Sequence, residues 1–254
     1  METKKPDEAE IIIQKLPSDI GIHRNSRKGT LNAPSVILER FEPESNVLVN
    51  EVFPDEFDLE ETHERIYRNT VDLLDYNNSV ISVGGDHSVS FPVIKALKEA
   101  NPEMELVWLD AHLDLKEKVD GHISHDVVVR ELLDSGFSED EITFVGITRI
   151  DEDEEKFLEN HDLTVYMADE VSEFLQKYQS EQEVYLSVDI DVLKQSEAPG
   201  TGYPVGQLSM KQVKKVIEKV SPFHADLVEV APPFDERSET IKNAEKILSF
   251  LLKE

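Results

Sequence analysis

Short apolar runs alternate with longer amphipathic segments along most of this chain of 254 residues. Strands that are buried on both faces form continuous apolar runs, whereas helices place apolar residues three or four positions apart. Their alternation predicts an α/β fold, a three-layer α-β-α sandwich around a mostly parallel sheet. The expected strands are residues 79–83, 105–109, 142–147, 163–166, 184–188 and 226–230, and the expected helices are 88–100, 125–135, a charged segment between 147 and 163, 209–220 and 239–252.

The chain is expected to form a single domain over residues 1–254, because no internal repeat or low-complexity linker interrupts the pattern. Large α/β domains reach this length. The first forty residues show the least regular pattern, and residues 23–32 are expected to form a loop.

Composition excludes several classes of protein. Hydrophobic residues make up 39% of the chain, which is enough for a substantial core, but no run approaches the length of a membrane span. The charged residues 1–10 do not resemble a secretory signal, and the absence of cysteine excludes a disulfide framework and a thiolate metal site. A cytoplasmic protein is therefore expected.

The charge balance is strongly acidic, with 26 basic against 54 acidic residues and a net charge of −28. Such a charge repels nucleic acid and anionic membranes, so neither is expected as a partner. The acidic residues are spread along the chain rather than gathered in a tail, which predicts adaptation to high salt, where self-repulsion is screened.

The motif with the most potential metal ligands follows the expected strand 105–109. It reads Asp110-Ala-His112-Leu-Asp114, and in extended chain residues spaced by two project to one side. A second pair of carboxylates, Asp189 and Asp191, follows the strand 184–188 in the same way.

Two further motifs accompany them. His87 follows Gly84-Gly85 after the strand 79–83, and Glu229 lies in the otherwise apolar strand 226–230. In open parallel sheets, ligands bind beyond the carboxyl ends of the strands, so these side chains are expected to meet. Each motif alone has an ordinary alternative, such as a helix cap or a local hydrogen bond. Independent capping does not explain all four together.

Four aspartates in one cleft would repel one another and raise their own pKa values. Two divalent cations would neutralise them, and His87 and His112 would serve as neutral ligands. Oxygen-rich coordination with some imidazole favours Mn²⁺, although ligand type does not separate Mn²⁺ from Co²⁺ or Fe²⁺. Two such ions can lower the pKa of a shared water and generate hydroxide. The residues therefore predict a dinuclear metal hydrolase.

From about Gly29 to the C-terminus, the motifs resemble in their order the ureohydrolase family of arginase, agmatinase and formimidoylglutamase. The matching segments are Gly84-Gly-Asp-His-Ser88, Asp110-Ala-His-Leu-Asp114, Ser187-Val-Asp-Ile-Asp191 with Ala198-Pro-Gly-Thr-Gly202, and Val228-Glu-Val230.

The resemblance implies two Mn²⁺ ions per chain and a bridging hydroxide that attacks the guanidinium carbon, giving urea and an amine. It implies that Glu229 binds the cationic guanidino substrate and that His125 carries a proton to the leaving amine, with His122 as a rival. It also implies a homo-oligomer, a trimer or a hexamer. One ion would be held by His87, Asp110, Asp114 and Asp189, and the other by Asp110, His112, Asp189 and Asp191, with Asp110 and Asp189 bridging.

Three departures from the family pattern border the expected substrate pocket. Lys194-Gln195 replaces an Asp-Pro pair, Val205-Gly206 shortens a Pro-Gly-Gly stretch, and the segment from Gly29 to Pro34 lacks an arginine. The altered loop around Lys194 leaves a non-catalytic metal-binding scaffold as an alternative. A deacetylase of the same fold is a third hypothesis, and it predicts one zinc ion and a tyrosine near the substrate carbonyl.

The stretch from Asp114 to His125 looks most like the short agmatinases, so agmatine is the expected substrate, giving putrescine and urea. Lys116 stands where arginases carry an asparagine that meets a carboxylate. A lysine there is either a partner for such a carboxylate or an ordinary solvated residue. Arginine, formimidoylglutamate and other guanidino acids therefore remain open.

Overall fold

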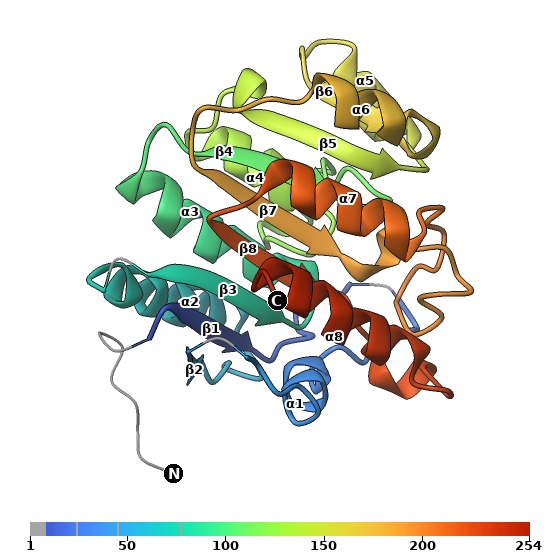
Figure 1. Ribbon diagram of the computed structural model, residues 1–254. Coiled ribbons are helices and arrows are strands. Elements are labelled where there is room, and N and C mark those ends of the chain that lie inside the picture. The colour runs from blue at the N-terminus through green and yellow to red at the C-terminus, as the bar shows by residue number, and fades with distance from the viewer. Residues whose placement is uncertain (1–8, 24, 45, 77) are drawn as a thin grey trace.

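The computed structural model describes residues 9–23, 25–44, 46–76 and 78–254. Within these residues, eight parallel strands form one sheet in the order β2-β1-β3-β8-β7-β4-β5-β6 (Figure 1). The predicted parallel α/β sandwich is confirmed. The strands are β1 (Ile11–Leu16), β2 (Val47–Glu51), β3 (Ser79–Gly84), β4 (Glu105–Leu109), β5 (Ile142–Ile147), β6 (Thr164–Met167), β7 (Val184–Asp189) and β8 (His224–Val228).

Helices cover both faces of the sheet, and each face has its own apolar cluster. The cluster on one face includes Ile37, Phe174, Val216 and Ile247, which come from four different helices. Side chains such as Ile66, Val93 and Leu132 pack on the other face beside Trp108. The first face carries α1 (Ala33–Leu38), α6 (Val171–Lys177), α7 (Met210–Val220) and α8 (Glu239–Leu251), and the second carries α2 (Leu59–Leu74), α3 (Ser90–Ala100), α4 (Val128–Asp134) and α5 (Glu152–Leu158) (Figure 1).

The helix α7 illustrates how the sequence determines an element of this fold. Val213, Val216 and Val220 lie three or four residues apart and are buried against the sheet. Ser209 caps the helix, since its hydroxyl accepts from the Gln212 N–H and the Gln212 side chain accepts from the Ser209 N–H.

Several elements are additional to those expected. They are β1, β2, α1, α2 and α6. The edge strand β2 is only partly buried, with Val49 51% exposed, so it lacks the continuous apolar run of a central strand. The expected loop is confirmed for residue 23 and residues 25–32, while Arg24 and residues 1–8 lie outside the described residues.

Two boundaries near the predicted site differ from expectation. The last central strand runs over His224–Val228 rather than 226–230, so Glu229 follows the strand instead of lying within it. The helix expected from residue 125 begins at Val128, so His125 lies in the preceding loop. None of the described helices combines the length and apolar character that a membrane crossing requires.

His224 gives the fold a testable dependence on pH. Its ring is buried, and its Nδ1 accepts from the Val80 N–H at 3.1 Å. Burial lowers the pKa of His224 to about 4. Because the unfolded chain binds a proton near pH 6.5, this histidine favours folding fully above that pH and loses its contribution as the pH falls towards 4.

As the pH falls from 7 to 5, we therefore expect the wild-type protein to lose roughly 2 kcal/mol more of its unfolding free energy than the His224→Asn variant loses. The asparagine oxygen can replace Nδ1 as acceptor but does not titrate. Urea-induced unfolding of both proteins at the two pH values measures the difference. Equal pH dependence in the two proteins would show that His224 is not buried in its neutral form.

Candidate metal centre and pocket

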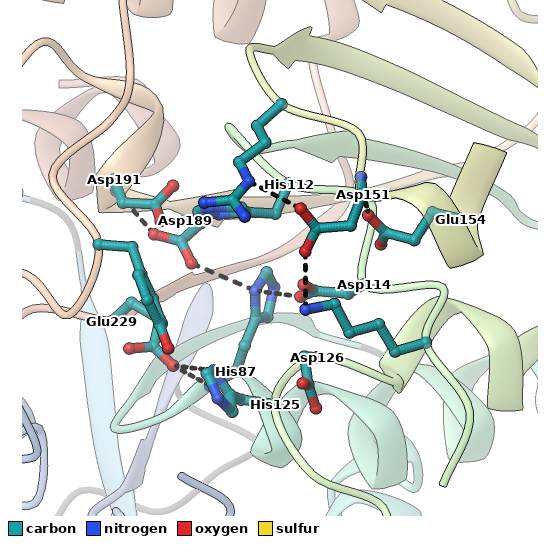
Figure 2. Close-up of a pocket in the computed structure, with 13 residues that line it drawn as sticks. His87, His112, Asp114, His125, Asp126, Asp151, Glu154, Asp189, Asp191 and Glu229 are labelled. Atoms are coloured by element: carbon teal, nitrogen blue, oxygen red, sulfur yellow. Dashed lines mark hydrogen bonds and ion pairs between the residues drawn. The ribbon is translucent and has the colours of Figure 1, made fainter. Parts of the chain in front are cut away.

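Four central strands, β3, β8, β7 and β4, lie side by side and deliver the predicted residues to one edge of the sheet. His87 follows β3, Glu229 follows β8, Asp191 follows β7 and Asp110 follows β4. Figure 2 shows His87, Asp191 and Glu229 facing a common space. The predicted convergence therefore occurs, because parallel neighbours end at the same edge.

His87 lies at the centre of this cluster and is 1% exposed. Its Nδ1 is 3.2 Å from Asp110 Oδ2, 3.3 Å from Asp114 Oδ2 and 3.4 Å from Asp189 Oδ2. Its ring stacks on Trp108, with centroids 4.0 Å apart and planes 5° from parallel. This buried aromatic support fixes the plane of the imidazole beneath the carboxylates.

Two groups of potential ligand atoms share Asp110. The first joins His87, Asp110 and Asp114, and the second joins Asp110, His112 and Asp191, with all atoms of a group within 4.8 Å of one another. His112 Nδ1 lies 3.0 Å from Asp191 Oδ2. Asp189 contacts the first group through His87, and its Oδ1 accepts from the N–H of Asp191 in the second group at 2.6 Å. The arrangement offers two adjacent cation positions with one carboxylate common to both.

The electrostatics of the cluster are unfavourable without cations. Burial raises the pKa of Asp189 well above its ordinary value, and the charges of Asp191 and Asp110 raise it further. Burial, together with the charge of Asp110, raises the pKa of Asp114 to about 7. Burial alone would lower the pKa of His87, but the three carboxylates around it raise that pKa well above its ordinary value.

The donor set also fits metal ions. His87 Nδ1 and Asp110 Oδ2 are buried and lie 3.2 Å apart, yet neither makes a hydrogen bond of acceptable geometry. Buried polar atoms are normally paired, and these two facing atoms can share a positive partner, either a proton or a metal ion. Carboxylate and imidazole donors without thiolate suit Mn²⁺, Co²⁺ or Fe²⁺.

The local backbone differs from the expectation that Asp110, His112 and Asp114 project from extended chain. The strand β4 ends at Leu109, and a bend follows. Asp114 has a φ of 52° and Glu229 a φ of 63°, so two non-glycine residues of the cluster adopt the left-handed conformation. Such conformations cost about 1–3 kcal/mol each and occur most often at functional sites.

Gly85, which precedes His87 by two residues, allows two backbone segments to approach each other closely. A Cβ on Gly85 would lie 1.8 Å from the backbone oxygen of Ser18. The Gly85 N–H also donates to Leu16 O, and the Glu229 N–H donates to Gly85 O. Only glycine fits between these backbones, and this turn positions both His87 and Glu229.

A cavity of about 160 Å³ opens beside the cluster. Glu229 and His125 form one wall, with His125 Nδ1 3.7 Å from Glu229 Oε1. Tyr203 covers the same region, since its ring is parallel to that of His125 within 11° and meets His112 edge-on. Tyr203 was not among the predicted residues, although it directly follows the motif that ends at Gly202.

The mouth of the cavity carries charges at Arg149 and Asp151 that sequence reasoning missed, beside Lys116, which it had considered. Asp151 binds Lys116 Nζ at 3.0 Å and Arg149 Nε at 2.7 Å, and Asp126 and Glu154 lie nearby (Figure 2). Arg149 and Asp151 follow β5 much as Asp110 follows β4. Extending the same strand-end argument to residues 142–147 would have found them.

Two of the residues considered earlier lie away from this cavity. The side chain of His122 is 47% exposed, stacks against His23 and lies 3.9 Å from Glu60. Lys194 pairs with Glu197 at 2.9 Å, so the altered Lys194-Gln195 segment adds no lysine to the cavity.

Arg27 of the N-terminal loop supports the loop beside the cavity, although the expected family arginine is missing from residues 29–34. Arg27 donates through Nε to Thr201 O and through Nη2 to Pro199 O, both at 2.9 Å. Its guanidinium also lies 4.3 Å from the centre of the Phe234 ring. Arg27 therefore supports the loop that carries Tyr203.

The parallel sandwich makes this chain an α/β protein. Its buried aspartates and histidines form groups of the kind that can hold metal ions. A family model described as Arginase family matches residues 9–252, and the chain belongs to the arginase family. Members of this family are hydrolases that act on amidines.

Similar proteins carry several activity names. The agmatinase of Bacillus anthracis is 29% identical over 97% of this chain and 92% of its own length. The arginase of Staphylococcus aureus strain COL is 27% identical over 85% of this chain and 80% of its own length. The structure of proclavaminate amidino hydrolase from Streptomyces clavuligerus has the same fold, with a TM-score of 0.87, 24% identity and coverage of 98% of this chain and 93% of that one.

Proposed function

We propose that this protein is a ureohydrolase that releases urea from a guanidino compound at a centre of two divalent cations. The observation that carries the proposal is the pair of ligand groups that share Asp110, with a carboxylate, Glu229, on the adjoining cavity wall. Family membership independently supports hydrolysis of an amidine.

Mn²⁺ is the proposed metal. When bound, two cations would neutralise the carboxylates and lower the pKa of a water molecule between them. The protein supplies the shape and dryness of the site, because the ligand carboxylates are nearly inaccessible to solvent. The proposed ligands are His87, Asp110, Asp114 and Asp189 for one ion, and Asp110, His112, Asp189 and Asp191 for the other, with Asp110 and Asp189 shared.

Glu229 is proposed to bind the guanidinium. Its Oε1 accepts from the His87 N–H at 2.9 Å, which anchors the carboxylate between the turn after β3 and the cavity. A carboxylate can accept two parallel hydrogen bonds from a guanidinium, which both binds and orients that group. The nearby ring of Tyr203 can contact the face of the same planar cation.

His125 is proposed to deliver a proton to the leaving amine, because it lies at the cavity wall 3.7 Å from Glu229 Oε1. We expect His125→Asn to lower kcat by about 10²-fold or more. The same substitution at His122, outside the cavity, is expected to leave kcat within about twofold of wild type. Steady-state urea release by the two variants tests the assignment, and the opposite ranking would transfer the role to His122.

Agmatine is the first proposed substrate, supported by the relative named agmatinase that spans nearly the whole chain. The charges at the cavity mouth give specific support to a second candidate, a guanidino acid. Lys116 and Arg149 share Asp151, and both cations keep N–H groups beyond those that Asp151 accepts. A carboxylate at the far end of the substrate would accept hydrogen bonds from these N–H groups. The ammonium of agmatine would instead bind the carboxylate of Asp126 or Asp151.

A substrate panel tests the proposal. Purified protein loaded with Mn²⁺ is assayed for urea with agmatine, arginine and guanidinobutyrate, and for formamide with formimidoylglutamate. Product from any one of these supports an amidine hydrolase, and their ranking identifies the group at the far end. Bound metal without product from any of them would favour the non-catalytic scaffold. One zinc ion per chain would favour the deacetylase alternative, to which Tyr203 would then contribute the expected tyrosine.

A further inference from the structure

A row of polar side chains crosses the middle of the sheet, where apolar residues are expected. Gln14 of β1 is in register with Ser82 of β3, Ser82 with Asp226 of β8, and Asp226 with Ser187 of β7. All four are 0% exposed. A buried polar group costs free energy unless it is hydrogen-bonded, so this row needs a physical explanation.

Asp226 accepts the hydrogen bonds made by the part of this row that lies nearest the candidate metal centre. Its Oδ2 accepts from the Tyr185 hydroxyl at 2.7 Å, and its Oδ1 accepts from the Ser187 hydroxyl at 2.8 Å and from the Val188 N–H at 3.2 Å. Burial raises the pKa of Asp226, and the charge of His87 together with the hydroxyls of Ser90, Tyr185 and Ser187 opposes that effect. Three donors aimed at its two oxygens are what the ionised form requires.

The hydrogen bond that Ser187 donates to Asp226 determines how Ser187 interacts with His87. Because Ser187 gives its single hydroxyl proton to Asp226, its oxygen can only accept from His87 Nε2, which lies 2.9 Å away. Nε2 then carries a proton, and in the neutral ring Nδ1 keeps its lone pair. Nδ1 is the nitrogen that faces Asp110, Asp114 and Asp189.

Two contacts thus determine how the imidazole is presented. Stacking on Trp108 fixes the plane of the ring, and the Ser187 hydroxyl fixes its rotation within that plane. Without Ser187, the Nε2–H would be a buried donor without a partner among the described contacts, and the ring would be free to turn.

We propose that Asp226 and Ser187 are positioning residues of the metal centre, in which Asp226 orients the Ser187 hydroxyl so that His87 presents the Nδ1 lone pair to a cation. This inference rests on the proposed metal centre. It also explains the presence of a carboxylate in the core of the sheet, where at least two strands separate β8 from either edge strand.

The neighbouring Tyr185 offers a matched control on the same strand. Ser187→Ala and Tyr185→Phe each remove one hydroxyl that donates to Asp226, but only Ser187 contacts His87. Mn²⁺ binding to the full-length metal-free protein is measured by titration calorimetry, and folding is checked by circular dichroism. We expect Ser187→Ala to weaken one of the two binding steps about 10–100-fold, as is usual when a partner of a ligand histidine is lost. Tyr185→Phe should stay within about threefold of wild type, while both variants lose a similar amount of thermal stability.

Asp226→Asn provides a second variant of nearly the same size. Its amide oxygen can still accept from Ser187, but the charge that enforces the direction of that bond is gone. It is expected to weaken the same binding step by a smaller factor than Ser187→Ala, and wild-type affinity would remove Asp226 from the proposal.

The outcomes separate this inference from the proposed function. Wild-type affinity in Ser187→Ala, or equal weakening in Tyr185→Phe, would overturn the positioning role while the metal centre stands. Equal weakening of both binding steps in Ser187→Ala would also overturn it, because general damage to the site does not select the ion bound by His87. Failure of the wild-type protein to bind Mn²⁺ would overturn the proposed metal centre itself.

Discussion

Asp189→Asn is expected to lower urea release by about a thousandfold and, at the same time, to raise the melting temperature of the metal-free protein. The loss follows because Asp189 would contribute to both ions, and a centre that stabilises the reaction by several kcal/mol would be broken. The gain follows because burial and the charges of Asp191 and Asp110 already disfavour a carboxylate at position 189. A neutral amide of the same size removes that repulsion.

This prediction is specific because urea release is expected to fall while the melting temperature of the metal-free protein is expected to rise. Activity is measured with Mn²⁺ at saturation, and melting temperature is measured by circular dichroism after exhaustive chelation. Asp169→Asn is the matched control, because Asp169 is exposed, follows the edge strand β6 and does not line the cavity. A variant that loses activity but also melts lower without metal would indicate that Asp189 stabilises the fold through contacts other than metal binding.

Thermal stability is expected to rise by roughly 10 °C or more between 0.1 M and 2 M KCl. The net charge of −28 makes the folded protein repel itself, and that repulsion is screened when the Debye length falls from about 10 Å at 0.1 M to about 3 Å at 1 M. Melting curves of the Mn²⁺-loaded protein across this range provide the test. A melting temperature that is flat or falls with KCl would contradict adaptation to high salt.

Local placement of charge can be separated from net charge with two substitutions. Asp72→Lys and Glu152→Lys each change the net charge by the same amount. Asp72 lies exposed in the last turn of α2, where the helix dipole disfavours an anion, so its replacement is expected to raise the melting temperature by about 2–4 °C at 0.1 M KCl. Glu152 lies in the first turn of α5 and pairs with Lys156 at 2.6 Å, so its replacement should give no such gain.

The central strands could be predicted from the sequence because they are buried on both faces. Strands such as β4 and β7 form short, continuous apolar runs that end in polar motifs. Two of the additional elements, β2 and α2, could not be predicted in the same way. Only part of β2 is buried, and the buried face of α2 mixes Ile66 and Leu73 with the polar residues Thr62, His63 and Thr70, which weakens its apolar period.

The candidate site was predictable where one motif follows one strand. His87, Asp110 and Asp191 come together because their strands are neighbours in a parallel sheet, which the alternation of elements had implied. The left-handed conformation of Glu229 and the shared ion pairs of Asp151 depend on contacts between distant segments. No spacing within a single segment encodes such contacts, so the mouth of the cavity and the role of Asp226 emerged only from the fold.

Urea release measured as Mn²⁺ is added stepwise to the metal-free protein tests the central claim most directly. The proposed centre predicts that activity with the best guanidino substrate rises until two ions are bound per chain and then stays constant. Full activity with one ion or none, or two bound ions without hydrolysis of any guanidino compound, would contradict it.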